Sequence, residues 1–271
     1  GWVSIRWKSR VRDRWNPTDS FENVRLIRRD LATKASQSAK PSLVAIGERL
    51  VEITNERPVA PSANLARIGQ ILQPALAEMF FTQRLILLEG IEDVAYINAW
   101  LTLTGRMTEF RKSGCHAVPV DGKSYLLRPA IIALQMHIPL HVIFDADSDK
   151  KDHEREGPLH ARDNGHLLKL FGADPAQPFP EETVWGAQYT MWKTDLASSV
   201  EADLVESLGE QGLSKVRDEA HARYGNAKNI KKNPMLIAAK LALALDAGAT
   251  SPSLDRLCER LINFGVQGAP S

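Results

Sequence analysis

The most constraining feature of this sequence is an alternation of short branched-apolar runs with helix-like segments between residues 84 and 149. Three runs are typical of buried strands that end in a turn: "RLILLEG" (84–90), the start of "GCHAVPVDGKS" (114–124) and "PLHVIFDAD" (139–147). The stretches between them, "IEDVAYINAWLTLTG" and "YLLRPAIIALQMHI", predict helices. A strand–helix–strand–helix–strand order favours an α/β fold in which right-handed crossovers join parallel strands.

Acidic residues directly follow two of these predicted strands. Glu89 ends the first, and Asp145, Asp147 and Asp149 alternate in "HVIFDADSD" (141–149). Carboxylates this close repel one another unless a cation lies between them. Because the carboxyl ends of parallel strands share one edge of a sheet, we expect Glu89 to meet Asp145 and Asp147 there. A solvated acidic loop would explain Asp149, but an unpaired charge at a buried strand end is unfavourable.

Composition and charge restrict the class of protein. The hydrophobic content of 44% and charged content of 25% are those of a soluble globular protein with one large or two smaller domains. No apolar stretch approaches the ~18 residues of a membrane span and no signal peptide opens the chain, so we expect a cytoplasmic protein without a membrane partner. Two cysteines, Cys115 and Cys258, exclude a disulfide framework and a cysteine-based zinc site.

The first 34 residues are basic although the whole chain has a net charge of only +1. They carry nine Lys or Arg against four acids, together with three tryptophans. A basic, aromatic stretch can follow a nucleic-acid backbone. It can equally be the edge of a domain that continues upstream, and the sequence leaves both interpretations open.

Weaker patterns predict the remaining elements. Proline and capping residues mark several of the boundaries, with Asn233 before Pro234 and Ser251 before Pro252 as helix starts. The expected elements are a strand in 23–30, a polar linker over 34–42, helices over 43–53 and 65–76, a solvated loop over 148–157, a helix in 160–173, one strand over 183–192, and helices near 198–224, 234–247 and 253–264.

Two known motifs use Asp-x-Asp in other ways. A calcium-binding EF-hand loop would place Asp145, Asp147, Asp149 and Glu156 at its ligand positions, but it needs Gly where Lys150 stands and a helix where "LHVIF" precedes. A phosphatase of the haloacid dehalogenase kind carries Asp-x-Asp after a strand, but has Thr or Val in place of Asp149. Its motif also comes early in the domain, whereas an acid-bearing strand–helix unit precedes this one.

The acid-bearing segments together resemble a known family. "PALAEMFFTQRLILLEGIEDVAYI" (74–97), "VDGKS" (120–124) and "IPLHVIFDADSD" (138–149) resemble the C-terminal region of OLD-family (overcoming lysogenization defect) endonucleases. The resemblance covers most of residues 65–245. It implies a Toprim (Rossmann-like) parallel sheet flanked by helices, with an additional helical domain. We expect a junction and helical segment over 1–80, the Toprim domain over 81–205 with an insertion near 150–182, and C-terminal helices over 206–271 that pack with the first helical segment.

The resemblance also implies roles for individual residues. Glu89 matches a strand-end glutamate that binds metal and has been proposed as a general base in some Toprim enzymes. A lysine near the start of a late helix contacts the scissile phosphate in the family. "NIKKNPMLIAAKL" offers Lys231, Lys232 and Lys240 for this role, and we choose Lys232, next to the helix cap. The implied metal ligands are Glu89, Asp93, Asp145, Asp147, Asp149 and Glu201, with Glu206 as the fallback for Glu201.

The implied function is a metal-dependent DNA endonuclease that uses two Mg²⁺ (or Mn²⁺) ions. The family joins an N-terminal ABC-type ATPase to the nuclease, and this chain has Ala117 where a phosphate loop would place its first glycine before "VDGKS". We therefore expect the nuclease half of an ATPase–nuclease protein, with DNA as partner and a homodimer in the full-length protein. Two alternatives stay open: a non-catalytic Toprim module that binds metal or DNA to regulate an attached ATPase, and the phosphatase.

Overall fold

The computed structural model describes residues 3–5, 21–29, 35–72, 74–224 and 232–265, so most of the basic N-terminal stretch and Lys231 lie outside it. Near the N-terminus, a small antiparallel sheet consists of β1 (Val3–Ile5), β2 (Leu26–Arg29) and β3 (Ser36–Ala39), and the 3-10 helix η1 (Phe21–Asn23) lies between β1 and β2 in the chain. The strand expected in 23–30 is confirmed. The linker expected over 34–42 is wrong in part, because Ser36–Ala39 pairs with β2 along its whole length.

The main sheet confirms the expected α/β architecture. Its strand order is β5-β4-β6-β8-β7, and the first four of these are mutually parallel. Their bounds are Cys115–Pro119 for β5, Arg84–Leu88 for β4, Leu140–Asp145 for β6, Tyr189–Trp192 for β8 and Val184–Trp185 for β7.

The single strand expected over 183–192 is wrong, because this segment is a hairpin in which β7 runs antiparallel to β8. Gly186 lies in its turn, where an added Cβ would come within 2.2 Å of the Tyr189 ring. The close packing of the turn on this ring therefore requires glycine, a contact that a periodicity argument does not detect.

Alternating residues of the central strands bury the two faces of the sheet in separate cores. Leu85, Leu87 and Phe144 belong to one core, and Ile86 and Ile143 belong to the other. The alternation follows from the two-residue repeat of a strand. The first core includes residues from six helices: α1 (Leu43–Thr54), α2 (Pro61–Ile71), α3 (Pro74–Ala77), η2 (Glu78–Phe81), α6 (Leu127–Gln135) and α7 (Glu156–Leu170). The second core includes residues from α4 (Ile91–Leu103), α5 (Met107–Lys112), α8 (Leu196–Tyr224), α9 (Pro234–Asp246) and α10 (Pro252–Asn263).

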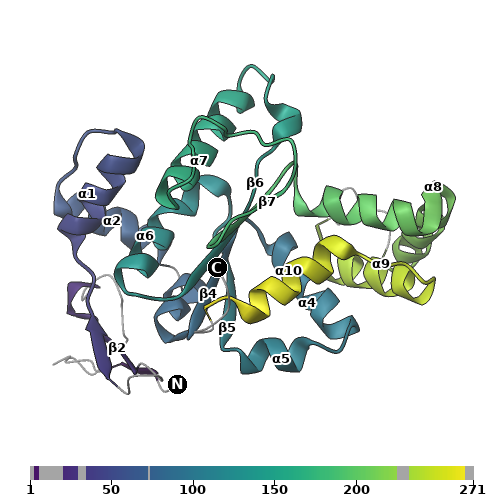
Figure 1. The fold of residues 1–271 in the computed structure, drawn as a ribbon, viewed down its shortest axis with the longest axis horizontal. Coiled ribbons are helices and arrows are strands. Elements are labelled where there is room, and N and C mark those ends of the chain that lie inside the picture. The colour runs from purple at the N-terminus through teal and green to yellow at the C-terminus, as the bar shows by residue number, and fades with distance from the viewer. Residues whose placement is uncertain (1–2, 6–20, 30–34, 73, 225–231, 266–271) are drawn as a thin grey trace.

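The expectation that the C-terminal helices pack with the 43–80 segment is wrong. Figure 1 shows α1 and α2 on one side of the sheet and α8 and α9 on the other. The two sets also belong to different cores. The reason is that both faces of a parallel sheet are apolar, so each face needs its own helical layer.

The expected helix starts near the C-terminus are confirmed. The Asn233 side chain accepts a hydrogen bond from the backbone N–H of Met235, and the Ser251 hydroxyl accepts one from Leu254. Helix α8 is interrupted at Gly209, whose φ of 68° and ψ of 166° lie outside the helical region. Among the helices of the described residues, none is long and apolar enough to cross a membrane.

Candidate active site

The predicted meeting of two strand ends is confirmed. Strands β4 and β6 are hydrogen-bonded neighbours with Leu88 opposite Ile143, so their carboxyl ends lie side by side. The backbone N–H of Asp145 points at the Glu89 carboxylate, with 3.4 Å between the amide nitrogen and Oε2. Two acids separated by 56 positions in the chain therefore share one edge of the sheet.

Asp93 joins Glu89 and Asp145 from the first turn of α4. The backbone N–H of Gly90 donates to Asp93 Oδ2 at 3.0 Å, which holds this carboxylate at the helix start beside Glu89. Burial, together with the charges of Glu89 and Glu92, raises the pKa of Asp93 to about 7, although the Gly90 hydrogen bond and the charge of Lys232 act in the opposite direction. Such a pKa means that the surroundings compensate the negative charge of the Asp93 carboxylate poorly.

Glu89 and Asp145 share this property. Burial raises the pKa of Glu89, although Lys123 opposes the shift. Burial raises the pKa of Asp145 well above its ordinary value, and the charges of Asp93 and Glu89 add to the effect. We call Glu89, Asp93 and Asp145 the acid cluster. Its members destabilise one another when all three are ionised.

Asp147 lies beside the acid cluster but in a different electrostatic environment. It adopts a left-handed conformation, with φ 53° and ψ 42°, at the start of the 3-10 helix η4 (Ser148–Lys150). Its carboxylate is 2.7 Å from Lys123 Nζ, 2.6 Å from Lys150 Nζ and 3.0 Å from His160 Nδ1. Burial acts to raise the Asp147 pKa, but the hydrogen bonds from Lys123 and Lys150 outweigh it and the pKa is lowered.

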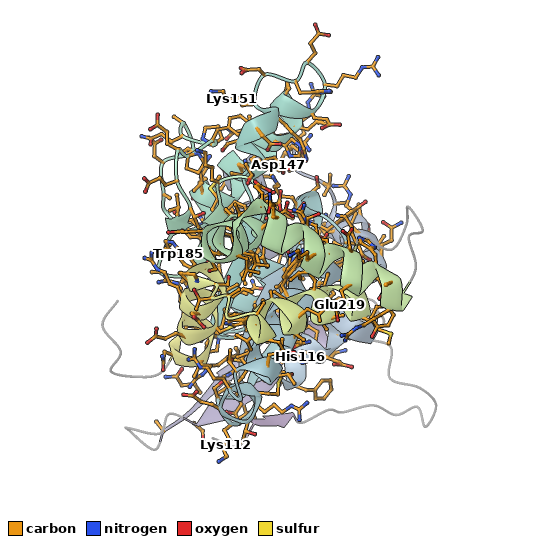
Figure 2. All side chains as sticks on the ribbon, turned by 90° about the vertical axis from the view of Figure 1, so that its right-hand side faces the viewer. Lys112, His116, Asp147, Lys151, Trp185 and Glu219 are labelled. Carbon is orange, nitrogen blue, oxygen red and sulfur yellow. The ribbon has the colours of Figure 1, made fainter. Side chains whose placement is uncertain are left out.

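Lys123 is a site residue that the sequence reasoning missed. Its side chain is only 4% exposed and lies in η3 (Lys123–Tyr125), the 3-10 helix after β5. Its ammonium binds Asp147, while its backbone N–H hydrogen-bonds the Glu89 carboxylate. The sequence could have revealed Lys123, because "VDGKS" directly follows a strand and therefore lies at the same sheet edge as Glu89 and Asp147. Figure 2 shows Asp147 within the body of the molecule and Lys151 nearer its outer end.

The other acids expected as ligands make contacts of their own. Asp149 is exposed on η4, and Glu206 is exposed on α8. Glu201 forms an ion pair with Arg217 and lines a cavity that also contains Tyr96 and Lys240. Among the described residues, no hydrogen bond or ion pair joins Asp149, Glu206 or Glu201 to the acid cluster.

Asp195 is a second residue that the sequence reasoning missed. It directly precedes α8, where its carboxylate accepts hydrogen bonds from the backbone N–H and hydroxyl of Ser198. Its charge is among those that raise the pKa of Asp145. The signal was available, because Asp195 follows the β8 strand much as Glu89 follows β4.

The candidate lysines lie at different depths. Lys232 is mostly exposed and its Nζ is 3.0 Å from Glu92 Oε2, at the rim of the acid cluster. Lys240 is half-buried, and its Nζ is 3.2 Å from the Tyr96 hydroxyl. Lys231 lies outside the described residues. Of the two described lysines, only Lys232 affects the pKa of Asp93.

Comparison with known families assigns the acid-bearing sheet. Residues 80–147 match the family described as overcoming lysogenization defect protein-like, Toprim domain. The chain contains an OLD-like Toprim domain. The match includes both members of the Asp145–Asp147 pair, so it sets aside the EF-hand and the haloacid dehalogenase phosphatase. A search of curated protein sequences finds no match.

Solved structures of OLD proteins resemble the chain at low sequence identity. The C-terminal region of the Burkholderia pseudomallei OLD protein is 16% identical over 66% of this chain and 96% of that one, with a TM-score of 0.44. Two structures of the C-terminal region of the Xanthomonas campestris pv. campestris OLD protein are 13% and 15% identical. They cover 68% and 69% of this chain and 96% and 95% of their own, each with a TM-score of 0.40.

The Toprim domain has carboxylate oxygens of the kind that bind metal ions, but they are not arranged around a common point. Within the described ranges, no three His, Cys, Asp or Glu side chains are grouped closely enough to hold a metal ion as they lie. Oxygen donors that are buried and mutually repulsive are nevertheless what a hard divalent cation binds. The acid cluster therefore fits such a cation by charge and ligand type, and binding would require its carboxylates to turn toward a shared point.

Proposed function

We propose that this Toprim domain is the catalytic part of a metal-dependent DNA endonuclease. The observation that carries the proposal is the acid cluster, in which burial and mutual repulsion raise the pKa of all three carboxylates. A Mg²⁺ or Mn²⁺ ion is the partner that would offset this charge. The OLD-like Toprim match supports DNA as the substrate, because it includes the strands that carry Glu89 and Asp145.

Each residue of the acid cluster, and Lys232 beside it, has a role in the proposed reaction. Divalent ions supply Lewis-acid stabilisation of the phosphodiester and an activated water when bound. Glu89, Asp93 and Asp145 would hold them, and Glu89 would also accept a proton from the attacking water. Lys232, at the rim of the cluster, would contact the scissile phosphate and offset its developing charge. A two-ion site, the ligand roles of Asp147 and Glu201, and a 5′-phosphate product remain predictions, whereas Asp149, exposed on η4, is no longer assigned a ligand role.

Plasmid cleavage tests the proposal and its main rival. We expect the purified chain to nick or cut supercoiled DNA with Mn²⁺ or Mg²⁺ and to leave it intact in EDTA, judged against a mock purification. A non-catalytic regulatory Toprim module would bind Mn²⁺ in a calorimetric titration but leave the plasmid unchanged. That combined result would overturn the nuclease assignment.

Divalent metal should stabilise the domain in a pH-dependent way. The pKa of about 7 for Asp93 in the folded protein lies above that of an unfolded aspartate, so the folded state binds the proton more tightly. The free energy of unfolding therefore falls as the pH rises from the pKa of an unfolded aspartate to about 7. At pH 8 a bound cation would offset the repulsion, and we expect saturating Mg²⁺ to raise Tm by roughly 5 °C. At pH 5 the gain should largely disappear. Equal gains at both pH values, measured by circular dichroism, would contradict this.

The larger assembly is also a proposal. The resemblance implies an N-terminal ABC-type ATPase in the same protein and a homodimer of the full-length chain. The domain boundaries near residues 80 and 205 likewise remain predictions.

A further inference from the structure

A basic cleft lies beside η3, the 3-10 helix whose Lys123 binds Asp147. It has a volume of about 190 Å³ and is lined by α1, α2 and the loop between them, η3, the start of α6 and the middle of α7. Ser124 and Tyr125 form part of its wall, and they immediately follow Lys123, which binds Asp147. One short helix therefore contacts the acid-bearing strand end with its first residue and this cleft with its next two.

The charge of the cleft is positive and largely uncompensated. Four arginines line it against two acids, Glu56 and Asp163. Asp163 already interacts with Arg162 and with the Ser124 hydroxyl. The other three arginines form no ion pair with any residue in the part of the chain that the structure describes; they are Arg57, Arg67 and Arg128.

Two buried polar atoms of the cleft also have no hydrogen-bond partner among the described residues. They are Oδ1 of Asn64, an acceptor on a side chain that is only 2% exposed, and Nε of Arg128, a donor from which an anion could accept a hydrogen bond. Burial lowers the pKa of Arg128 and the neighbouring charge of Arg67 lowers it further, whereas the charge of Glu56 opposes both shifts. A half-buried guanidinium next to a second one is unfavourable unless negative charge lies between them, and a bound anion would add to the charge that Glu56 supplies. Arginine is the side chain best suited to phosphate, because it donates two parallel hydrogen bonds.

Tyr125 adds an aromatic surface to this site. Its ring lines the cleft and the residue is 55% exposed, which is unusual for a large ring beside a well-packed core. Exposed rings beside basic grooves are typical of surfaces that stack the bases of single-stranded nucleic acid. We propose that the cleft binds the sugar–phosphate backbone of the DNA strand next to the scissile bond, with the phosphate held by Arg57, Arg67 and Arg128 and a base stacked on Tyr125.

The inference rests on the proposed function, because it takes the acid cluster as the point where the strand is cut. Binding can be measured without cleavage, by fluorescence anisotropy of a single-stranded oligonucleotide in EDTA. The double variant Arg57→Gln/Arg67→Gln changes two exposed side chains, so the fold should persist. We expect it to bind about tenfold more weakly and to lower the slope of log affinity against log salt by about 1.4. Arg111→Gln, an exposed arginine outside the cleft, should match the wild type.

The ring is tested separately. Tyr125→Ala should weaken binding about tenfold, whereas Tyr125→Phe, which keeps the stacking face, should bind like the wild type. Competition by inorganic phosphate alone at low millimolar concentration, with no effect of Tyr125→Ala, would assign the cleft to a small anion and overturn the inference. Unchanged affinity and salt slope in the double variant would also overturn it. Neither result affects the nuclease proposal, which fails only if plasmid cleavage fails, and cleft-dependent binding without cleavage would leave this inference standing.

Discussion

Asp145→Asn is expected to abolish metal-dependent DNA cleavage while making the metal-free protein more stable. Asp145 lies against Glu89 and is repelled by both other members of the acid cluster. Loss of one metal-binding carboxylate should lower the cleavage rate by about 10²- to 10³-fold. The same change removes a buried charge that the protein does not compensate, so Tm at pH 8 in EDTA should rise. Opposite effects on activity and stability are expected of a functional site built from charges that the protein does not compensate.

Asp149→Asn provides the matched control for this substitution. Asp149 carries the same side chain four residues later, but it is exposed on η4. We expect its replacement to leave Tm unchanged and to alter plasmid cleavage by less than a few-fold. Circular dichroism checks the fold of both variants. Wild-type cleavage by Asp145→Asn, or a lower Tm for that variant in EDTA, would show that the acid cluster is not the catalytic site.

Lys123→Met is expected to destabilise the protein by about 3 kcal/mol, because it removes one partner of a buried ion pair. The Lys123 and Asp147 side chains are 4% and 11% exposed, so water cannot replace the lost ammonium. Methionine keeps an unbranched apolar stem of similar length, which confines the effect largely to the charge. Urea denaturation at pH 7 measures the change in the free energy of unfolding.

Two further variants separate the ion pair from simple packing. Lys150→Met removes the second lysine on Asp147, but this side chain is 42% exposed, so we expect a loss below about 1 kcal/mol. The double variant Lys123→Met/Asp147→Asn removes both buried charges and should recover part of the stability that Lys123→Met loses. If the double variant loses more free energy of unfolding than Lys123→Met and Asp147→Asn lose together, Lys123 stabilises the protein through packing and not through its charge.

Sequence alone was sufficient for strands β4, β5 and β6 of the main sheet and for the pair of acids at the ends of β4 and β6. The run of branched apolar residues before Glu89, and the similar run before Asp145, predicted two buried parallel strands. Parallel topology brings the carboxyl ends of such strands to one edge, so the contact between Glu89 and Asp145 followed from a general rule of α/β folds. Asp93 was implied by the family resemblance, and its place in the first turn of the next helix accounts for its position beside Glu89.

What surrounds those acids was decided by tertiary structure. The left-handed backbone at Asp147 turns its carboxylate toward Lys123 and Lys150, and no periodicity in the sequence encodes that rotation. Glu201 and Asp195 lie six residues apart, and the start of α8 decides which of them faces the strand ends. The distribution of helices between the two faces likewise depends on long-range packing. Strand-end convergence depends on backbone hydrogen bonding, which local patterns predict, whereas side-chain orientation and helix placement depend on contacts between residues far apart in the chain.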